Sequence, residues 1–324
     1  MTEIRAGIVG TGSCLPEKVL TNEELTRMVE TTDEWITTRT GIKERRLTDY
    51  GTSTADLAVV AAKRALSAAN VNPAEVDLII VGTSSPDMLF PSVGCILQDK
   101  VGAKNAAAFD VSAACSGFNF ALATASAFIE NNQYKCALVV GADTLTKYLD
   151  FTDRDTCVLF GDGAGAAVLK PVKDGSGILC NFLMAEGAGG NYLTMPGGGS
   201  RDPELKNGKR FISMNGKEVF KFAVRALETS VRKVLDKAGL QPADIDLLIP
   251  HQANIRIINH VCTKMKLPKE KVFINLHKYG NTSAASIPIA LDEALADGKI
   301  KKGDVVVLAG FGAGLTYGAN LMKW

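Results

Sequence analysis

The sequence predicts an α/β protein built from two similar halves, and three observations support this prediction. Apolar segments that read as buried strands alternate with segments of helical periodicity. Residues 64–80 (RALSAANVNPAEVDLII) resemble residues 233–249 (KVLDKAGLQPADIDLLI) at an offset of 169 positions. The same offset relates FAL at 120–122 to IAL at 289–291. It also relates Gly141, which follows an apolar strand, to Gly310, which follows another. A constant offset in three segments favours a duplicated architecture whose halves pack as one body.

The stretch from Ser53 to Thr83 shows how the elements are expected to follow one another. Ser53 begins a helix with a capping box, and Asn72-Pro73 ends the helical pattern. Residues 76–81 then read as a buried strand.

The boundary between the halves is expected near residue 175, which gives the halves 1–175 and 176–324. The glycine-, proline- and charge-rich segment 186–210 is the clearest loop. A long helical pattern starts near Asn215, after this loop.

Composition and charge exclude several classes of protein. The chain has 324 residues, of which 46% are hydrophobic and 22% charged, and its formal net charge is +1. This balance is typical of a globular protein and gives no global attraction for nucleic acid. No apolar run approaches the roughly 20 residues that span a bilayer, and the first residues, MTEIRAGIVGTG, lack the apolar core of a signal peptide. We therefore expect a cytoplasmic protein that binds neither nucleic acid nor membrane.

The cysteine and histidine content limits the kinds of site that the chain could form. The seven cysteines are odd in number and none forms a CxxC pair, so we expect no disulfide framework and no metal site. The glycine-rich segments near residues 10 and 161 lack the third glycine or the lysine that nucleotide binding needs. Only three histidines, His251, His260 and His277, could partner a reactive cysteine.

Cys115 lies in a turn of small residues between a predicted strand and a predicted helix. Residues 109–111 read as a buried strand end, residues 112–117 (SAACSG) as the turn, and residues 118 to about 130 as an apolar helix. The partial positive charge at a helix N-terminus stabilises a thiolate, which predicts a lowered thiol pKa. An inert buried cysteine is the alternative, and this segment alone does not decide between the two.

Two further polar residues have similar positions. His251 directly follows the predicted strand 245–249, and ligands gather at the carboxyl ends of strands in α/β sheets. Asn281 precedes a predicted helix that contains Ile287 and Leu295, although a cap or turn residue would look the same. Together the three loops give a Cys/His/Asn set.

Three motifs around these residues resemble the active-site motifs of β-ketoacyl-[acyl carrier protein] synthase III, of the thiolase superfamily. They are DVSAACSGFNFAL from Asp110, HQANIRI from His251 and GNTSAASIPIAL from Gly280. The resemblance covers essentially the whole chain, and it includes WITTRTGI from Trp35 and GFGAGLTYGA from Gly310. It implies the thiolase-like, duplicated αβαβα five-layer fold, in agreement with the offset of 169.

The resemblance also implies an acyltransferase that begins type II fatty-acid synthesis. An acetyl-CoA or short or branched acyl-CoA primer would acylate Cys115. Malonyl-acyl carrier protein would then lose CO2, and its carbanion would attack the thioester to give 3-oxoacyl-acyl carrier protein. His251 and Asn281 would donate hydrogen bonds to the enolate oxygen. The backbone N–H groups of Cys115 and Ala313 would form the oxyanion hole, although the family commonly has Gly in place of Ala313. No cofactor is implied, because the CoA thioesters are substrates.

CoA-binding residues follow from the same resemblance. Trp35 would stack on the adenine, with Arg39 or Arg154 on its other face or near the phosphates. Phe220 and Asn254 match positions that line the pantetheine channel.

Contacts with other chains are implied as well. Phe90 resembles a residue that one subunit lends to its partner's acyl pocket, which implies a homodimer. Lys221, Gln252 and Arg256 are expected to dock the acidic carrier protein. Residues 206–237 hold nine basic and three acidic side chains, and such a basic face would steer an acidic partner.

Several alternatives remain at this point. A thiolase would need a second Cys in the final glycine loop, which has none, and a hydroxymethylglutaryl-CoA synthase would need a catalytic Glu. A related starter or long-chain 3-oxoacyl synthase of secondary metabolism would keep the same three residues. A non-catalytic partner subunit and a Cys/His hydrolase lie outside this chemistry, and release of CO2 from malonyl-acyl carrier protein would separate them from a condensing enzyme.

Overall fold

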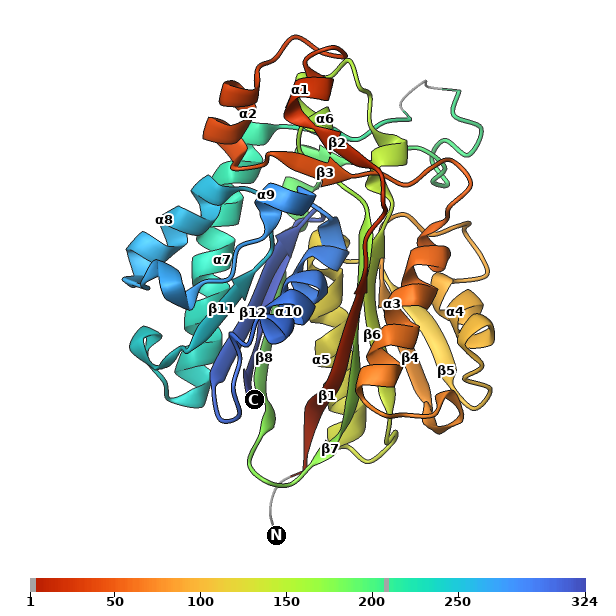
Figure 1. Cartoon of the computed structure of the whole chain (residues 1–324), viewed down its shortest axis with the longest axis vertical. Coiled ribbons are helices and arrows are strands. Elements are labelled where there is room, and N and C mark those ends of the chain that lie inside the picture. Colours follow the sequence, from red (N-terminus) through yellow and green to blue (C-terminus); the bar gives the residue numbers. More distant parts are fainter. Residues whose placement is uncertain (1–3, 207–209) are drawn as a thin grey trace.

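Two β-sheets lie side by side in the computed structural model, which describes residues 4–206 and 210–324 (Figure 1). The first sheet has the order β1-β7-β6-β4-β5, with β1 (Arg5–Cys14), β4 (Leu78–Gly82), β5 (Ala107–Val111), β6 (Ala137–Asp143) and β7 (Gly163–Val172). The second has the order β11-β12-β13-β8, with β8 (Gly177–Ala185), β11 (Leu247–Pro250), β12 (Val305–Gly312) and β13 (Thr316–Lys323). The expected boundary near residue 175 falls between β7 and β8.

Helices form the other three layers. Between the two sheets lie α5 (Gly117–Glu130) and α10 (Ser286–Ala296). The outer face of the first sheet is covered by α3 (Thr54–Ala68) and α4 (Val93–Val101). The outer face of the second is covered by α7 (Gly216–Ala238) and α8 (Ile255–Met265). The predicted αβαβα architecture is therefore confirmed.

Alternation along the central strands divides their side chains between two cores. In β4, Leu78 and Ile80 pack with the central helices, whereas Ile79 and Val81 pack with α3 and α4. Strands that are buried on both faces read as continuous apolar runs. This is why the strand in residues 76–81 could be recognised from the sequence.

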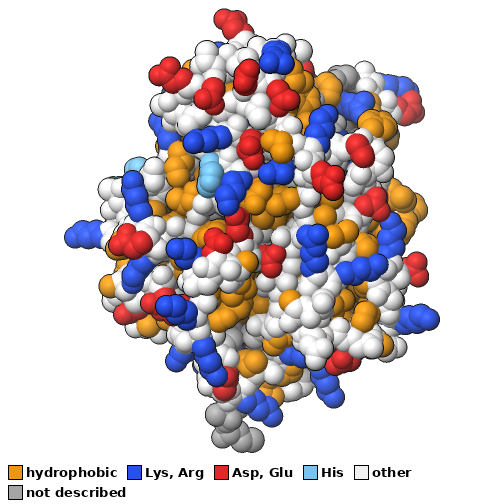
Figure 2. Space-filling model, in the orientation of Figure 1, with side chains coloured by type: hydrophobic (Ala, Val, Ile, Leu, Met, Phe, Trp, Pro, Cys, Tyr) orange, Lys and Arg blue, Asp and Glu red, His pale blue; other side chains and the backbone are white. Residues whose placement is uncertain are grey.

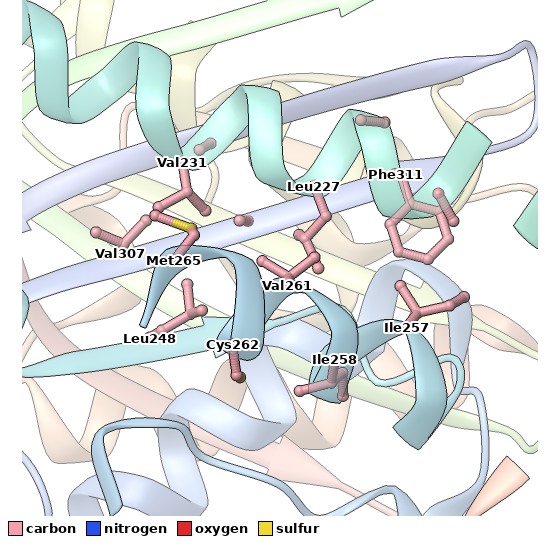
Figure 3. Packing of buried hydrophobic residues seen from close by; sticks show 14 of the residues in the cluster. Leu227, Val231, Leu248, Ile257, Ile258, Val261, Cys262, Met265, Val307 and Phe311 are labelled. Atoms are coloured by element: carbon pink, nitrogen blue, oxygen red, sulfur yellow. The ribbon is translucent and has the colours of Figure 1, made fainter. Parts of the chain in front are cut away.

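A third core holds α7 and α8 against the second sheet. Leu227 and Val231 of α7 point toward Val261 and Met265 of α8, and Val307 of β12 belongs to the same cluster (Figure 3). Burial of each such side chain stabilises the fold by about 1.5–3 kcal/mol. The arrangement leaves the basic side chains of both helices on the solvent side.

The two halves have the same backbone conformation where the central helices α5 and α10 begin. The central helices start at Gly117 and Ser286, which are 169 residues apart. Each is preceded by a 3₁₀ turn, the Cys115 turn (Ala114–Ser116) and the Ser283 turn (Ser283–Ala285). The first residue of each turn has a positive φ, of 46° and 53° respectively. The duplication predicted from the sequence thus extends to the backbone conformation of these turns.

Smaller elements cap one end of the sheets (Figure 1). The buried Arg45 ties this cap together, because its guanidinium donates to the backbone oxygens of Leu20 and Val158 and to the Asn22 side chain. The capping elements are α1 (Asn22–Leu25), α2 (Asp33–Thr40), α6 (Arg154–Cys157), α9 (Leu276–Tyr279), and the strand pairs β2 (Val19–Thr21) with β3 (Glu44–Arg46) and β9 (Leu193–Thr194) with β10 (Ser213–Met214). Further 3₁₀ turns are Pro73–Glu75, Leu145–Tyr148, Gly187–Tyr192, Pro242–Asp244 and Lys269–Lys271.

Two details differ from the expectation. The strand that ends at Val111 is the edge strand β5, and Phe109 on it is 36% exposed rather than buried. The expected loop 186–210 contains a 3₁₀ turn and β9, and its residues 207–209 lie outside the described residues.

The long helix expected near Asn215 is α7, and the Asn215 side chain caps it by accepting from the N–H of Glu218.

Candidate active site

Cys115 occupies the turn that joins β5 to α5, as expected. Its side chain is only 5% exposed, and the Ser283 hydroxyl lies 3.3 Å from its Sγ. Gly312, at the end of β12, is required beside this turn, because a Cβ there would lie 2.6 Å from the Cys115 backbone nitrogen. The ends of two sheets therefore meet at the nucleophile.

His251 follows the carboxyl end of β11 and is 1% exposed. Its backbone N–H donates to the carbonyl of Ala309, and its ring meets Phe311 edge to face at 5.1 Å. Its Nδ1 lies 2.6 Å from the Ser286 hydroxyl, which also accepts from the N–H of Gln252 at 3.4 Å. The Ser286 hydrogen is therefore assigned to a bond with Nδ1, which leaves the imidazole proton on Nε2.

Asn281 is fixed between two segments of backbone. Its N–H donates to the carbonyl of Leu159, and its own carbonyl accepts from the N–H of Gly161. Its side-chain Oδ1 accepts from the N–H of Ser283 at 2.9 Å. Because the oxygen is engaged in this way, the side-chain NH₂ is the group left for a ligand.

These three side chains line one cavity whose other walls are mostly apolar, among them Phe222, Phe311 and Leu315. Within the described residues, its lining contains no Asp, Glu, Lys or Arg. Such a cavity offers neutral N–H donors in mostly apolar surroundings, where each hydrogen bond is stronger than in water.

Burial sets the protonation states in this cavity. It raises the pKa of the Cys115 thiol to about 12, and it lowers the pKa of His251 to about 3. The lowered thiol pKa predicted from the helix N-terminus is thus wrong for the substrate-free protein, because loss of hydration outweighs the partial charge of the turn. At neutral pH the site holds a thiol and an uncharged imidazole.

A second, smaller cavity also reaches Cys115. It is lined by Ser283, by Ala313 and by apolar side chains that include Leu145 and Ile212. The first cavity continues outward as well, because it shares Leu159 and four other lining residues with an outer cavity, namely Met214, Gly216, Phe220 and Asn254.

The outer cavity contains a cluster of cations around one indole. The guanidinium of Arg154 lies 4.6 Å from the ring centre of Trp35, and that of Arg39 lies 5.0 Å from it. Lys221 and Arg256 also line this cavity. It therefore suits a ligand with a flat ring and anionic groups.

Proteins of known family resemble this chain over nearly its whole length. A family model described as 3-oxoacyl-[acyl-carrier-protein] synthase III matches residues 109–187. A second model, described as the C-terminal part of the same synthase, matches residues 235–324. A protein of Caldanaerobacter subterraneus subsp. tengcongensis named beta-ketoacyl-[acyl-carrier-protein] synthase III is 56% identical, over 99% of this chain and 98% of that protein. The chain belongs to the β-ketoacyl-[acyl-carrier-protein] synthase III family.

Solved structures of the synthase III family have the same fold. The structure titled 3-oxoacyl-[acyl-carrier-protein] synthase III from Aquifex aeolicus has a TM-score of 0.93 and is 50% identical, covering 98% of this chain and 100% of that one. A priming β-ketosynthase of a polyketide biosynthetic pathway has the same TM-score at 35% identity, covering 100% of this chain and 98% of that one.

Two residues expected from the synthase III pattern lie away from the cavities. Phe90 is 83% exposed and lines none of the three cavities described here. Gln252 is 1% exposed, and its amide is bonded to the backbone of Pro250, Phe273, Asn275 and Leu276. The expectation that Gln252 docks the carrier protein is corrected, because its side chain cannot reach a partner. It joins the end of β11 to α9 instead.

Sequence reasoning missed three polar residues near the synthase site. Ser283 and Ser286 hydrogen bond to Cys115 and His251, and Asp143 accepts from the N–H of Ala284 in the Ser283 turn. The first two lie within the motif around Asn281 but give no separate signal among other small residues. Asp143 ends the apolar strand β6 and is fully buried. A charged residue at the end of a buried strand was the only signal that could have found it.

No group of three or more His, Cys, Asp or Glu side chains that could hold a metal occurs among the described residues. In the same part of the chain, no helix combines the length and apolarity needed to cross a membrane.

Proposed function

We propose that the chain condenses an acyl-CoA primer with malonyl-acyl carrier protein, giving 3-oxoacyl-acyl carrier protein, CoA and CO2, and so initiates fatty-acid synthesis. One observation carries this proposal. A buried cysteine shares an uncharged cavity with two neutral N–H donors, and the cavity leads outward to a cationic site around Trp35. The names of relatives at 52–56% identity support the same activity.

The first step is transfer of the acyl group to Cys115. Its sulfur attacks the thioester carbonyl of acyl-CoA, the proton that Cys115 loses passes to the departing CoA sulfur, and CoA leaves as its thiol. The tetrahedral oxyanion would be held by the backbone N–H groups of Cys115 and Ala313, two residues that line the smaller cavity. The acyl chain would occupy that cavity, between Leu145 and Ile212.

The second step is loss of CO2 from the malonyl thioester. The developing enolate places negative charge on the thioester oxygen, and His251 Nε2–H and the Asn281 NH₂ would both donate to it. A neutral cavity suits this step because a carboxylate beside the enolate would oppose it. No base is required, since the electron pair comes from the bond to CO2. The carbanion then attacks the acyl-Cys115 thioester.

The outer cavity would hold the CoA nucleotide. The adenine would stack on Trp35 and displace one of the two guanidinium groups that now flank it, Arg39 or Arg154. The displaced guanidinium would then be free to pair with phosphate. Phe220 and Asn254 lie where the outer cavity joins the inner one and would line the pantetheine channel.

The experiment that tests the proposed chemistry separates the two steps. Cys115→Ala should give no acyl adduct by intact mass with any acyl-CoA. His251→Ala and Asn281→Ala should still be acylated, but release of CO2 from malonyl-acyl carrier protein should fall about 10²–10³-fold for each lost donor. Normal condensation by either variant would refute the assigned roles.

The carrier protein would dock on the exposed basic sides of α7 and α8, near Lys221 and Arg256. Charges of both signs are mixed over the face seen in Figure 2, and Lys and Arg side chains project from its left edge, over α8. Arg256 is exposed, and its guanidinium lies 5.4 Å from the ring centre of Phe220. Phe220 lines both the outer cavity and the main cavity.

Charge reversal at Arg256 tests this docking site. Arg256→Glu should raise the KM for malonyl-acyl carrier protein at least about tenfold at low salt, because a repulsion replaces an attraction, and added salt should reduce the effect. Lys63→Glu makes the same charge change on α3 and is the control. An equal rise in KM for both proteins, or none for Arg256→Glu, would argue against docking there.

We further propose a cytoplasmic homodimer that needs no cofactor. All seven cysteines are free, as is typical of proteins from reducing compartments.

A further inference from the structure

Gln252 lies beside the imidazole that the proposed mechanism uses, but that mechanism assigns its side chain no role. It directly follows His251 after the end of β11 and is 1% exposed. Its amide forms hydrogen bonds through both the oxygen and the nitrogen, to the backbone of four residues. A buried amide that is fully engaged in this way fixes the segments that it joins.

The nitrogen of this amide holds the end of β11. Its Nε2 donates to the carbonyl of Pro250 at 2.7 Å and to the carbonyl of Phe273 at 3.1 Å. A side-chain NH₂ has two hydrogens, and both are used here. Since Pro250 directly precedes His251, these bonds fix the backbone from which the imidazole projects.

The oxygen of the same amide holds the start of α9. Its Oε1 accepts from the N–H of Asn275 at 3.1 Å and from the N–H of Leu276 at 3.3 Å, which are groups that a helix start leaves without a partner of its own. The carbonyl of Leu276 accepts in turn from the N–H of Gly280 at 2.8 Å. Gly280 directly precedes Asn281, so a path of hydrogen bonds leads from the residue after His251 to the residue before Asn281.

A second path joins the same segments through α10. The Asn275 side chain donates from Nδ2 to Glu293 of α10 at 2.8 Å. The same helix begins at Ser286, whose hydroxyl is bonded to His251 Nδ1 and accepts from the backbone N–H of Gln252. The segments β11, α9 and α10 are therefore linked in a closed ring, and Gln252 forms a bond to each of them.

The decarboxylation step gives this ring a chemical purpose, because its two donors come from different segments. One thioester oxygen has to lie about 3 Å from both His251 Nε2 and the Asn281 side-chain nitrogen. A displacement of about 1 Å between such groups can slow a reaction about 10²-fold. Acylation uses neither donor, since its oxyanion would be held by backbone N–H groups.

We propose that Gln252 is a positioning residue for decarboxylation, which sets His251 and Asn281 at the separation that one enolate oxygen requires. This inference rests on the proposed function of the site. It gives the segment 250–256 two separate tasks, alignment of the donors by the buried Gln252 and docking of the carrier protein by the exposed Arg256. The two tasks predict different kinetics, because docking acts on the KM and alignment acts on kcat.

Gln252→Met tests the alignment, because methionine has a similar length but forms none of the four hydrogen bonds. In this variant kcat for release of CO2 from malonyl-acyl carrier protein should fall about 10²-fold. Its KM for the carrier protein and its rate of acylation by acetyl-CoA, measured by intact mass, should stay within about twofold of the unaltered protein. Gln98→Met is the control, since it removes a half-buried amide that donates to the carbonyl of Ala103 after the end of α4, and it should leave both steps unchanged.

Combination with Asn281→Ala distinguishes alignment from a general loss of structure. Once Asn281 has lost its amide, the thioester oxygen can follow His251 alone, so adding Gln252→Met should cost less than about fivefold in CO2 release. A partly misfolded protein would lose the same factor in both backgrounds. The proposal is overturned by a further 10²-fold loss in the double variant, by equal losses of acylation and CO2 release in Gln252→Met, or by no loss at all.

Hydrogen exchange followed by mass spectrometry measures the same bridge without any substrate. The amides of residues 275–281 should exchange at least about tenfold faster in Gln252→Met, whereas those of α7 should not change. Unchanged exchange at residues 275–281 would also overturn the proposal. Failure of the unaltered protein to release CO2 would instead refute the proposed function, while the exchange rates would still judge the bridge.

A second variant is available if Gln252→Met does not fold by circular dichroism. Gln252→Glu keeps an oxygen that accepts from Asn275 and Leu276, but its carboxylate would face the carbonyls of Pro250 and Phe273 without a hydrogen to donate. We expect the same selective loss of CO2 release and the same faster exchange. An active Gln252→Glu with unchanged exchange would contradict the proposal.

Discussion

At the scale of single residues, burial rather than charge defines this site. His251 is surrounded by apolar groups, and its pKa is lowered to about 3. Over the working pH range it is a neutral donor whose proton is placed by Ser286. An imidazolium at this position would be poorly solvated, so the same burial that prepares the donor makes the protein sensitive to acid.

The pH dependence of stability tests this view of His251. The unfolded imidazole titrates near 6.5 and the folded one near 3. Between these values the unfolded state binds more protons, so the free energy of unfolding falls as pH falls through this window. Relative to His251→Asn, the unaltered protein should lose about 2.6 kcal/mol more stability on going from pH 7.5 to 4.5.

Urea unfolding at the two pH values measures the difference, with His260→Asn as a control for loss of an exposed histidine. Equal losses in the unaltered protein and in His251→Asn would show that His251 is not held neutral by the fold.

The sequence allowed the three residues with expected catalytic roles to be identified, but not the polar residues that hydrogen bond to them. Cys115 could be found because a strand, a turn of small residues and a helix have separate periodicities. Ser283 and Asp143 could not, because their contacts join the two halves: Ser283 contacts Cys115 across 168 positions of the chain, and Asp143 contacts Ala284 across 141. The error on Gln252 has a similar cause, since position in a motif does not tell whether a side chain points outward.

At the scale of elements, the site exists because two turns and two strand ends approach each other without intervening side chains. A Cβ on Gly141 of β6 would overlap the carbonyl of Ala284 in the Ser283 turn. A Cβ on Gly82 of β4 would lie 2.5 Å from the backbone carbon of Gly117 at the start of α5. Both contacts involve backbone atoms, which cannot move aside as a side chain can.

Gly141→Ala should therefore damage both stability and the site. We expect a loss of about 1–3 kcal/mol in the free energy of unfolding from overpacking, together with slower acylation of Cys115, because the displaced Ser283 turn carries the hydroxyl beside the thiol. Urea unfolding and intact mass measure the two effects. Gly51→Ala is the control, since the nearest atom to its Cβ would be Asp49 Oδ1 at 3.8 Å. Unchanged stability in Gly141→Ala would contradict this account of the packing.

At the scale of the whole molecule, the site lies where the internal symmetry is broken. The central turns and helices match at 169 residues, yet Cys115 corresponds to Ala284, and His251 corresponds to Gly82. The periodicity shared by the halves made the architecture predictable from sequence. The differences between the halves make the site, and only their positions in space show which differences matter.

The described surface also contains an unprotected sheet edge. β5 pairs with β4 on one side only, and it carries neither proline nor lysine between Ala107 and Val111. On the segment that precedes α4, Leu89 and Phe90 are 80% and 83% exposed. Natural proteins usually cover or charge such an edge. A second copy related by a twofold axis would cover it by pairing β5 with its own equivalent.

This interface is tested by the mass of the protein in solution. The unaltered chain should have twice its mass of 34.4 kDa by light scattering. Phe109→Lys places a charge on the edge strand and should give a monomer, because burying an unpaired ammonium in the interface is unfavourable. Met28→Lys, on the cap, should remain a dimer. Phe90→Ala should also remain a dimer but accept a different range of primers, since Phe90 would close the partner's acyl cavity. A monomeric unaltered protein with full condensing activity would rule out both the interface and the shared pocket.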